Sequence, residues 1–110
     1  MAKHKYKIGK LTINGEEYPA CVNLRVMQKL EDEGIGFDDA FNGAHRWSNL
    51  GYIITCALEE GARLSGAEAP LTEDEIGDMI DITDLEDISE QLAALLGKSS
   101  RTVEAEPPKN

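Results

Sequence analysis

The sequence predicts an α+β fold that is mostly α: an N-terminal β-hairpin, then four or so helices in a small bundle, then a disordered C-terminal tail. Three observations support this fold class. Asn14-Gly15, the dipeptide that best suits a two-residue hairpin turn, separates two short segments that contain strand-forming residues. Between residues 24 and 96, apolar residues recur at helical intervals of three and four. Only 5% of the residues are aromatic, so the core must be largely aliphatic, which favours packed helices.

The hairpin is expected over residues 5–22. A type I′ turn at Asn14-Gly15 sets the pairing of the two strands. A slip of one residue in this pairing would send every side chain to the opposite face of the hairpin. Pro19 cannot donate a ladder hydrogen bond, so the second strand is expected to be short or to lie at an edge. Pairing outward from the turn gives the register Ile13 with Glu16, Leu11 with Tyr18 and Gly9 with Ala20.

The first two helices are expected over about residues 24–33 and 44–64. Asn23 is a suitable N-cap for the first, and Gly34 suits the left-handed residue that commonly follows a helix. The second carries the longest apolar pattern in the chain, from Trp47 to Gly61. It is therefore expected to be the central helix.

Two further helices are expected over about residues 73–80 and 84–96. Thr72 with Glu75, and Thr83 with Glu86, each have the spacing of a capping box. The last apolar stripe stops at Gly97. Residues 98–110 have no apolar period and are expected to be disordered, which leaves residues 1–97 as a single domain.

The charge of the chain is acidic and uneven. The net charge of −10 favours solubility and basic partners and disfavours direct nucleic-acid binding. Residues 1–30 carry six basic and two acidic side chains, whereas residues 31–97 carry two basic and seventeen acidic ones. No apolar run reaches the length of a membrane-spanning helix, so no membrane association is expected.

No catalytic, cofactor-binding or metal-binding residues are expected. The histidines are His4 and His45, and the one conceivable nucleophilic pair, Cys56 with His45, is separated by eleven residues of one expected helix. Cys21 and Cys56 lie among apolar residues and are expected to be buried, reduced thiols. Residues 73–90 hold nine acidic residues, but these miss the spacing of a calcium loop and are better explained by helix starts and solvated helix faces.

Four segments follow one another along the chain: the strand pair LTINGEEYPA, the helix NLRVMQKLEDEGI, the long apolar helix WSNLGYIITCALEEGARL, and a final module that contains LTEDEIGDMID and DLEDISEQLAALLG. In this order they resemble the tail assembly chaperones of long-tailed bacteriophages and related gene transfer agents. The resemblance covers about residues 6–97. It is a similarity in the order of elements and in their capping, with no catalytic motif.

The resemblance implies a non-enzymatic chaperone that binds the phage tape measure protein, keeps its apolar helices soluble and helps recruit tail tube proteins. It implies a location in the cytoplasm of the infected bacterial host and absence from the mature virion, and it leaves self-association open. The edges of the apolar stripes are then expected to hold a partner helix. Trp47, the only tryptophan, is expected in the core in preference to an interface. The candidate partner contacts are Trp47, Leu50, Ile54, Leu58, Ile88 and Leu92.

An alternative function is that of an acidic nucleic-acid mimic, which would inhibit a host DNA-binding protein. A net charge of −10 on a small protein suits this function. A mimic needs carboxylates arrayed like phosphates on one surface, whereas those of this chain are spread over several expected helices. The affinity of a mimic would fall steeply with ionic strength, and the capture of an apolar helix would not.

Overall fold

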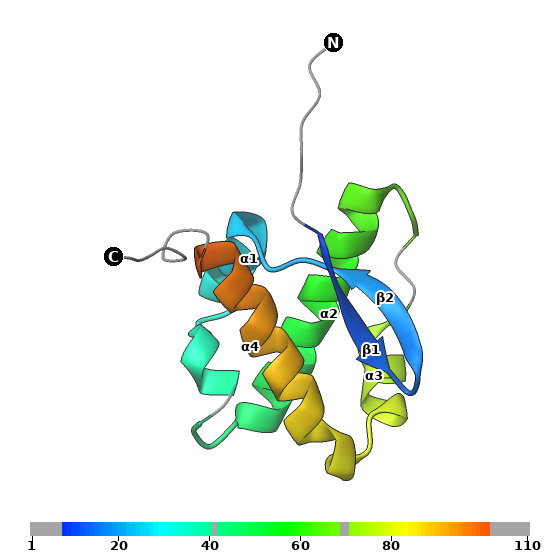
Figure 1. Cartoon of the computed structure of the whole chain (residues 1–110). Coiled ribbons are helices and arrows are strands. Elements are labelled where there is room, and N and C mark those ends of the chain that lie inside the picture. The colour runs from blue at the N-terminus through cyan, green and yellow to red at the C-terminus, as the bar shows by residue number, and fades with distance from the viewer. Residues whose placement is uncertain (1–7, 41, 69–70, 102–110) are drawn as a thin grey trace, which may run out of the picture.

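The computed structural model in Figure 1 describes residues 8–40, 42–68 and 71–101. An antiparallel β-hairpin is followed by four helices, as the sequence predicted. The elements are β1 (Gly9–Ile13), β2 (Glu16–Ala20), α1 (Leu24–Asp32), the 3-10 turn η1 (Phe37–Ala40), α2 (Arg46–Ser65), α3 (Glu73–Met79), the 3-10 turn η2 (Ile82–Asp84) and α4 (Leu85–Arg101).

The hairpin has the predicted register, in which Ile13 pairs with Glu16 next to the turn. Asn14 and Gly15 have φ angles of 54° and 82°, the left-handed values that a type I′ turn requires. Alternate residues therefore point inward, and Leu11 and Ile13 are buried. Residues 5–7 of the expected hairpin lie outside the described residues.

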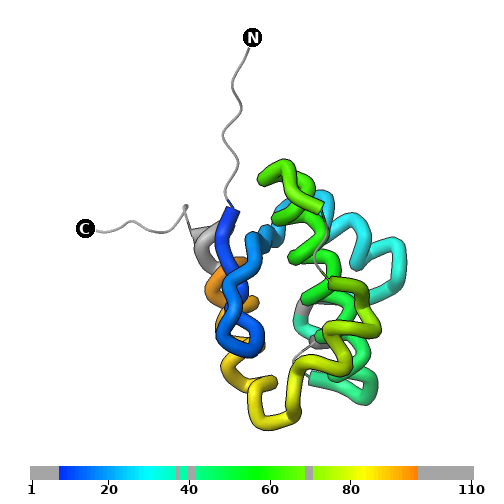
Figure 2. The backbone as a smooth tube through the Cα atoms, turned by 90° about the vertical axis from the view of Figure 1, so that its right-hand side faces the viewer, coloured from blue at the N-terminus to red at the C-terminus, as the bar shows by residue number. Residues whose placement is uncertain are grey.

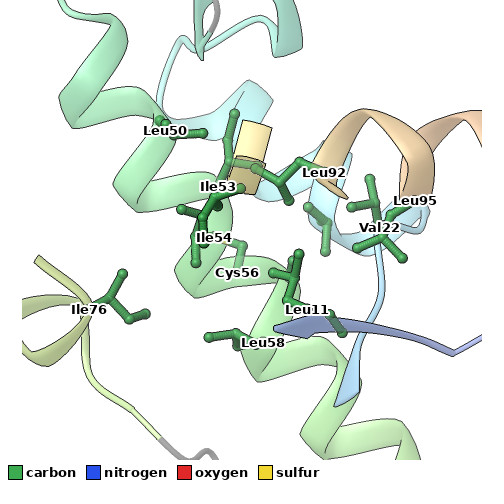
Figure 3. Packing of buried hydrophobic residues seen from close by; sticks show 14 of the residues in the cluster. Leu11, Val22, Leu50, Ile53, Ile54, Cys56, Leu58, Ile76, Leu92 and Leu95 are labelled. Atoms are coloured by element: carbon green, nitrogen blue, oxygen red, sulfur yellow. The ribbon is translucent and has the colours of Figure 1, made fainter. Parts of the chain in front are cut away.

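Two layers enclose the core. Figure 2 shows the hairpin and α4 on one side and α1, α2 and α3 on the other. β1 lies beside α4 and β2 packs on α2, which is the central helix as expected. Side chains from both strands and all four helices fill the space between the layers, and Figure 3 shows Leu11, Leu58 and Leu92 among them. The inward-facing stripe of α2 is therefore covered by the chain itself.

Three of the predicted helix ends have the expected chemistry. The Asn23 side chain accepts a hydrogen bond from the Val26 N–H at 3.1 Å. Gly34, just beyond α1, has a φ angle of 73°. Thr72 and Glu75 form both hydrogen bonds of a capping box, at 3.1 and 2.9 Å. These bonds join residues that are neighbours in the chain, which explains why the sequence alone predicts them.

The start and end of α4 differ from the sequence prediction. The expected capping box of Thr83 and Glu86 does not form, because Thr83 lies in η2 and α4 begins only at Leu85. The Thr83 hydroxyl donates to Asp81 at 2.8 Å. At the other end, α4 continues through Gly97 to Arg101. A glycine lowers helix propensity by about 1 kcal/mol but does not forbid a helical backbone. The rest of the expected tail, residues 102–110, lies outside the described residues.

The helix α2 approaches β2 at Gly61. A Cβ atom at this position would overlap the backbone of Pro19 and Ala20. Directly beside this contact, the Cys21 N–H donates to the carbonyl of Ala57 at 3.0 Å. The absence of a side chain at Gly61 thus lets the end of β2 lie against the central helix.

Candidate interaction surfaces

Five of the six candidate partner contacts lie in the core of the protein. Each has at most 2% of its surface exposed, because the two layers cover the apolar stripes on which these residues lie. This fold encloses them, and their role as partner contacts stays a prediction. They are Leu50, Ile54, Leu58, Ile88 and Leu92.

Trp47 is the exception, and its expected place in the core was wrong. Its side chain is 57% exposed in the first turn of α2. The guanidinium carbon of Arg46 lies 5.1 Å from the centre of the Trp47 ring, a cation–π distance. The backbone and side chains of residues 43–48 surround a shallow hollow of about 270 Å³ at this site. Tryptophan and arginine are the residue types that most often anchor protein interfaces.

A second large apolar side chain is exposed at the same end of the molecule. Ile82 lies in η2 and is 62% exposed. Figures 1 and 2 both place η2 at the end where α2 begins, the lower end in each view. Leu24, which is 72% exposed, opens α1 toward the opposite end. The end that carries Trp47 and Ile82 is called the tryptophan end below.

A groove of about 480 Å³ lies between α1, α2 and the start of α3. Cys56, on its α2 wall, is buried, and this burial is the main cause that raises the pKa of its thiol. Burial also raises the pKa of Tyr52 to about 12, with the neighbouring Cys56 as the next cause. At neutral pH the thiol and the phenol are therefore both protonated, and neither is activated as a nucleophile.

The only histidine–cysteine pair on α2 is far apart. His45 occupies the N-cap position of α2 and Cys56 follows eleven residues later. This spacing corresponds to roughly 16 Å along the helix axis. His4 lies outside the described residues. In the described part of the chain, no group of three or more His, Cys, Asp or Glu side chains is placed to hold a metal ion.

Glu60 is a buried carboxylate that was not predicted from the sequence, and it is 1% exposed. Its oxygens accept hydrogen bonds from Asn23 Nδ2 at 2.8 Å and from Arg63 Nε at 3.1 Å, and Arg25 lies at 4.0 Å. The Arg63 hydrogen bonds are the main cause that lowers the pKa of Glu60. This cluster links the start of α1 to the C-terminal part of α2. A local signal existed, because Arg63 follows Glu60 at the helical spacing of an ion pair.

The outer edge of β1 is covered by a side chain of α4. The Thr12 N–H donates to Gln91 Oε1 at 2.7 Å, and Gln91 Nε2 donates to the Thr12 carbonyl at 3.1 Å. The Gln91 amide thus occupies the place that a neighbouring strand would take. On the other strand, Pro19 has no N–H to offer. Both features protect a sheet edge against pairing with another chain.

Within the described residues, no helix has the length and apolar character needed to cross a membrane.

Comparisons with protein-family models, with curated proteins and with solved structures give no match to this chain.

Proposed function

We propose that this protein is a non-enzymatic tail assembly chaperone of the type found in long-tailed bacteriophages. It would bind the tape measure protein and help recruit tail tube subunits in the cytoplasm of the infected host. The observation that carries the proposal is the order of the segments that resemble this family. They correspond in turn to the hairpin, α1, α2 and the pair α3 and α4.

The surface chemistry is compatible with this function. Because the apolar stripes are enclosed, a partner helix has to be met by side chains that remain outside the core. The tryptophan end offers Trp47, Arg46 and Ile82, which combine an aromatic anchor, a cation and an aliphatic side chain. The net charge of −10 would keep a complex with an apolar partner soluble.

Co-expression tests the proposal. The tagged full chain is produced together with the long helical protein encoded near it, and the retained partner is quantified. We expect wild type to retain it and Trp47→Ala to retain several-fold less. Leu24→Ala is the matched control, because it removes another exposed apolar side chain toward the opposite end.

Each outcome of this experiment has a separate meaning. If wild type retains no such partner, the proposed function is wrong. If Trp47→Ala and Leu24→Ala reduce retention equally, the assignment of the tryptophan end is wrong. Circular dichroism of both variants checks that they are folded.

The acidic mimic remains an alternative because of one observation. Nine carboxylates follow one another along α3, η2 and the first half of α4, and all nine residues are exposed. A mimic would bind a basic DNA-binding protein with an affinity that falls by orders of magnitude between low and high salt. Retention of an apolar helical partner that persists at high salt favours the chaperone.

A further inference from the structure

The groove between α1, α2 and α3 plays no part in the proposed contact at the tryptophan end. Its uncharged lining includes Tyr52, the buried Cys56 and Leu71. Among the described residues, its charged lining consists of Glu59, Glu73 and Glu75 with a single cation, Lys29. Neutral, partly apolar residues and acidic residues thus line the same hollow.

The one cation of the groove is already engaged. Lys29 Nζ lies 3.6 Å from Glu59 Oε1, so this pair is locally balanced. Glu75 accepts the Thr72 N–H at 2.9 Å, which fixes its carboxylate beside the groove without neutralising it. Glu73 forms no ion pair with any described residue. Three carboxylates and one ammonium leave the groove with a net charge of −2.

The charged side chains of the groove come from three different helices: Lys29 from α1, Glu59 from α2, and Glu73 with Glu75 from α3. A group that enters the groove therefore meets carboxylates from both α2 and α3. Phosphate groups and acidic peptides would be repelled there.

A long cationic side chain has the chemistry that complements this groove. The aliphatic stem of an arginine or lysine can lie on Tyr52 and Leu71, while its charged end reaches the carboxylates. Arginine fits better than lysine, because its planar guanidinium can stack on an aromatic ring and can donate to two carboxylates at once.

We propose that the groove binds an arginine side chain of a partner protein. The inference rests on the proposed function in one respect, namely that the occupant belongs to a protein. It names a second contact, at α1, α2 and α3, in addition to the tryptophan end.

A titration with short peptides tests this inference. The ¹⁵N-labelled full chain is titrated with the blocked tripeptide acetyl-Leu-Arg-Leu-amide, and acetyl-Leu-Gln-Leu-amide is the neutral control. We expect saturable shifts of the backbone amide signals of Tyr52, Cys56 and Glu73 with the arginine peptide. The glutamine peptide should bind about tenfold more weakly, since it lacks the charge-assisted hydrogen bonds.

A matched pair of variants separates the groove from general attraction to an acidic protein. Glu59→Gln with Glu73→Gln removes two charges from the groove and should weaken arginine-peptide binding about fivefold. Asp74→Asn with Glu86→Gln removes two exposed charges that do not line it and should change binding less than twofold. The spectra also show that each variant keeps its fold.

Three results would overturn the inference: no saturable shift at the groove, equal binding of the two peptides, or equal weakening by both double variants. The co-expression experiment keeps the two proposals apart. If the arginine peptide binds but no tape measure protein is retained, only the proposed function fails. If the partner is retained but the peptide does not bind, only the groove inference fails.

Discussion

Replacing Gly61 by alanine tests the contact that holds the hairpin on the central helix. The added Cβ atom would overlap the backbone of Pro19 and Ala20, which are the last residues of β2. Because backbone atoms cannot move aside like the tip of a flexible side chain, β2 has to shift away from α2. That shift also lengthens the hydrogen bond from the Cys21 N–H to the Ala57 carbonyl, now 3.0 Å.

The size of the effect follows from three contributions. Overpacking in a close-packed interior costs about 1–3 kcal/mol. Weakening the hydrogen bond adds about 1 kcal/mol. The higher helix propensity of alanine returns about 1 kcal/mol. We therefore expect Gly61→Ala to lower the free energy of unfolding by about 2 kcal/mol, a large part of the total stability of a small domain.

Gly51, ten residues earlier on α2, supplies the control. Beyond its chain neighbours and the backbone of α2 itself, a Cβ atom there would have no atom of the described residues within 4 Å. Gly51→Ala should therefore raise the free energy of unfolding by about 0.5–1 kcal/mol. Urea unfolding followed by far-UV circular dichroism measures both variants against wild type. If Gly61→Ala is as stable as Gly51→Ala, then the backbone of β2 does not lie directly against α2 at Gly61, and the reasoning is refuted.

Three further predictions concern stability. Gln91→Ala should lower the free energy of unfolding by about 1–2 kcal/mol, because both hydrogen bonds to Thr12 are lost. Urea unfolding measures this change, and an unchanged unfolding midpoint would contradict the prediction. Hydrogen bonds from Arg63 are the main cause that lowers the pKa of Glu60 in the folded state. The ionised Glu60 therefore contributes its full stabilisation above the pKa of an unfolded carboxyl, and this stabilisation is lost as the pH falls through the lower folded pKa. Glu60→Gln should therefore be about 2 kcal/mol less stable than wild type at pH 7 and closer to it in acid, and an equal difference at both pH values would show that the charge is unimportant. Thr72→Ala removes the cap of α3 and should lower the free energy of unfolding by about 1 kcal/mol. Hydrogen exchange of the backbone amides of α3 should become faster, and unchanged exchange would contradict the capping box.

The elements that the sequence predicted well depend on residues close together in the chain. Asn14-Gly15 specifies the turn and, through it, the strand register. Asn23 and Thr72 mark two helix starts because each side chain bonds an N–H only three residues away. The capping pattern at Thr83 failed because residues Ile82–Asp84 form the 3-10 turn η2, which moves the start of α4 to Leu85. A local pattern therefore predicts a helix start well when no other local structure forms at the same residues.

The candidate site was harder to predict for a different reason. An apolar stripe on a helix has the same pattern whether the protein's own layers or a partner cover it. Leu50 and Leu58 share the stripe of Trp47, yet they are buried and Trp47 is 57% exposed. The groove at Cys56 likewise combines residues from α1, α2 and α3 that no sequence motif links.

By itself, the sequence determined the hairpin with its register, four helices, two of their caps and the acidic balance of charge. Each of these depends on periodicity or on contacts within a few residues. Only the tertiary structure decided which apolar faces are enclosed, why Gly61 has to lack a side chain, and where Glu60 and Gln91 find their partners. Asn23 meets Glu60 across 37 residues and Thr12 meets Gln91 across 79. Such pairs form only when elements distant in the chain pack together, because nothing in the local chain brings their atoms together.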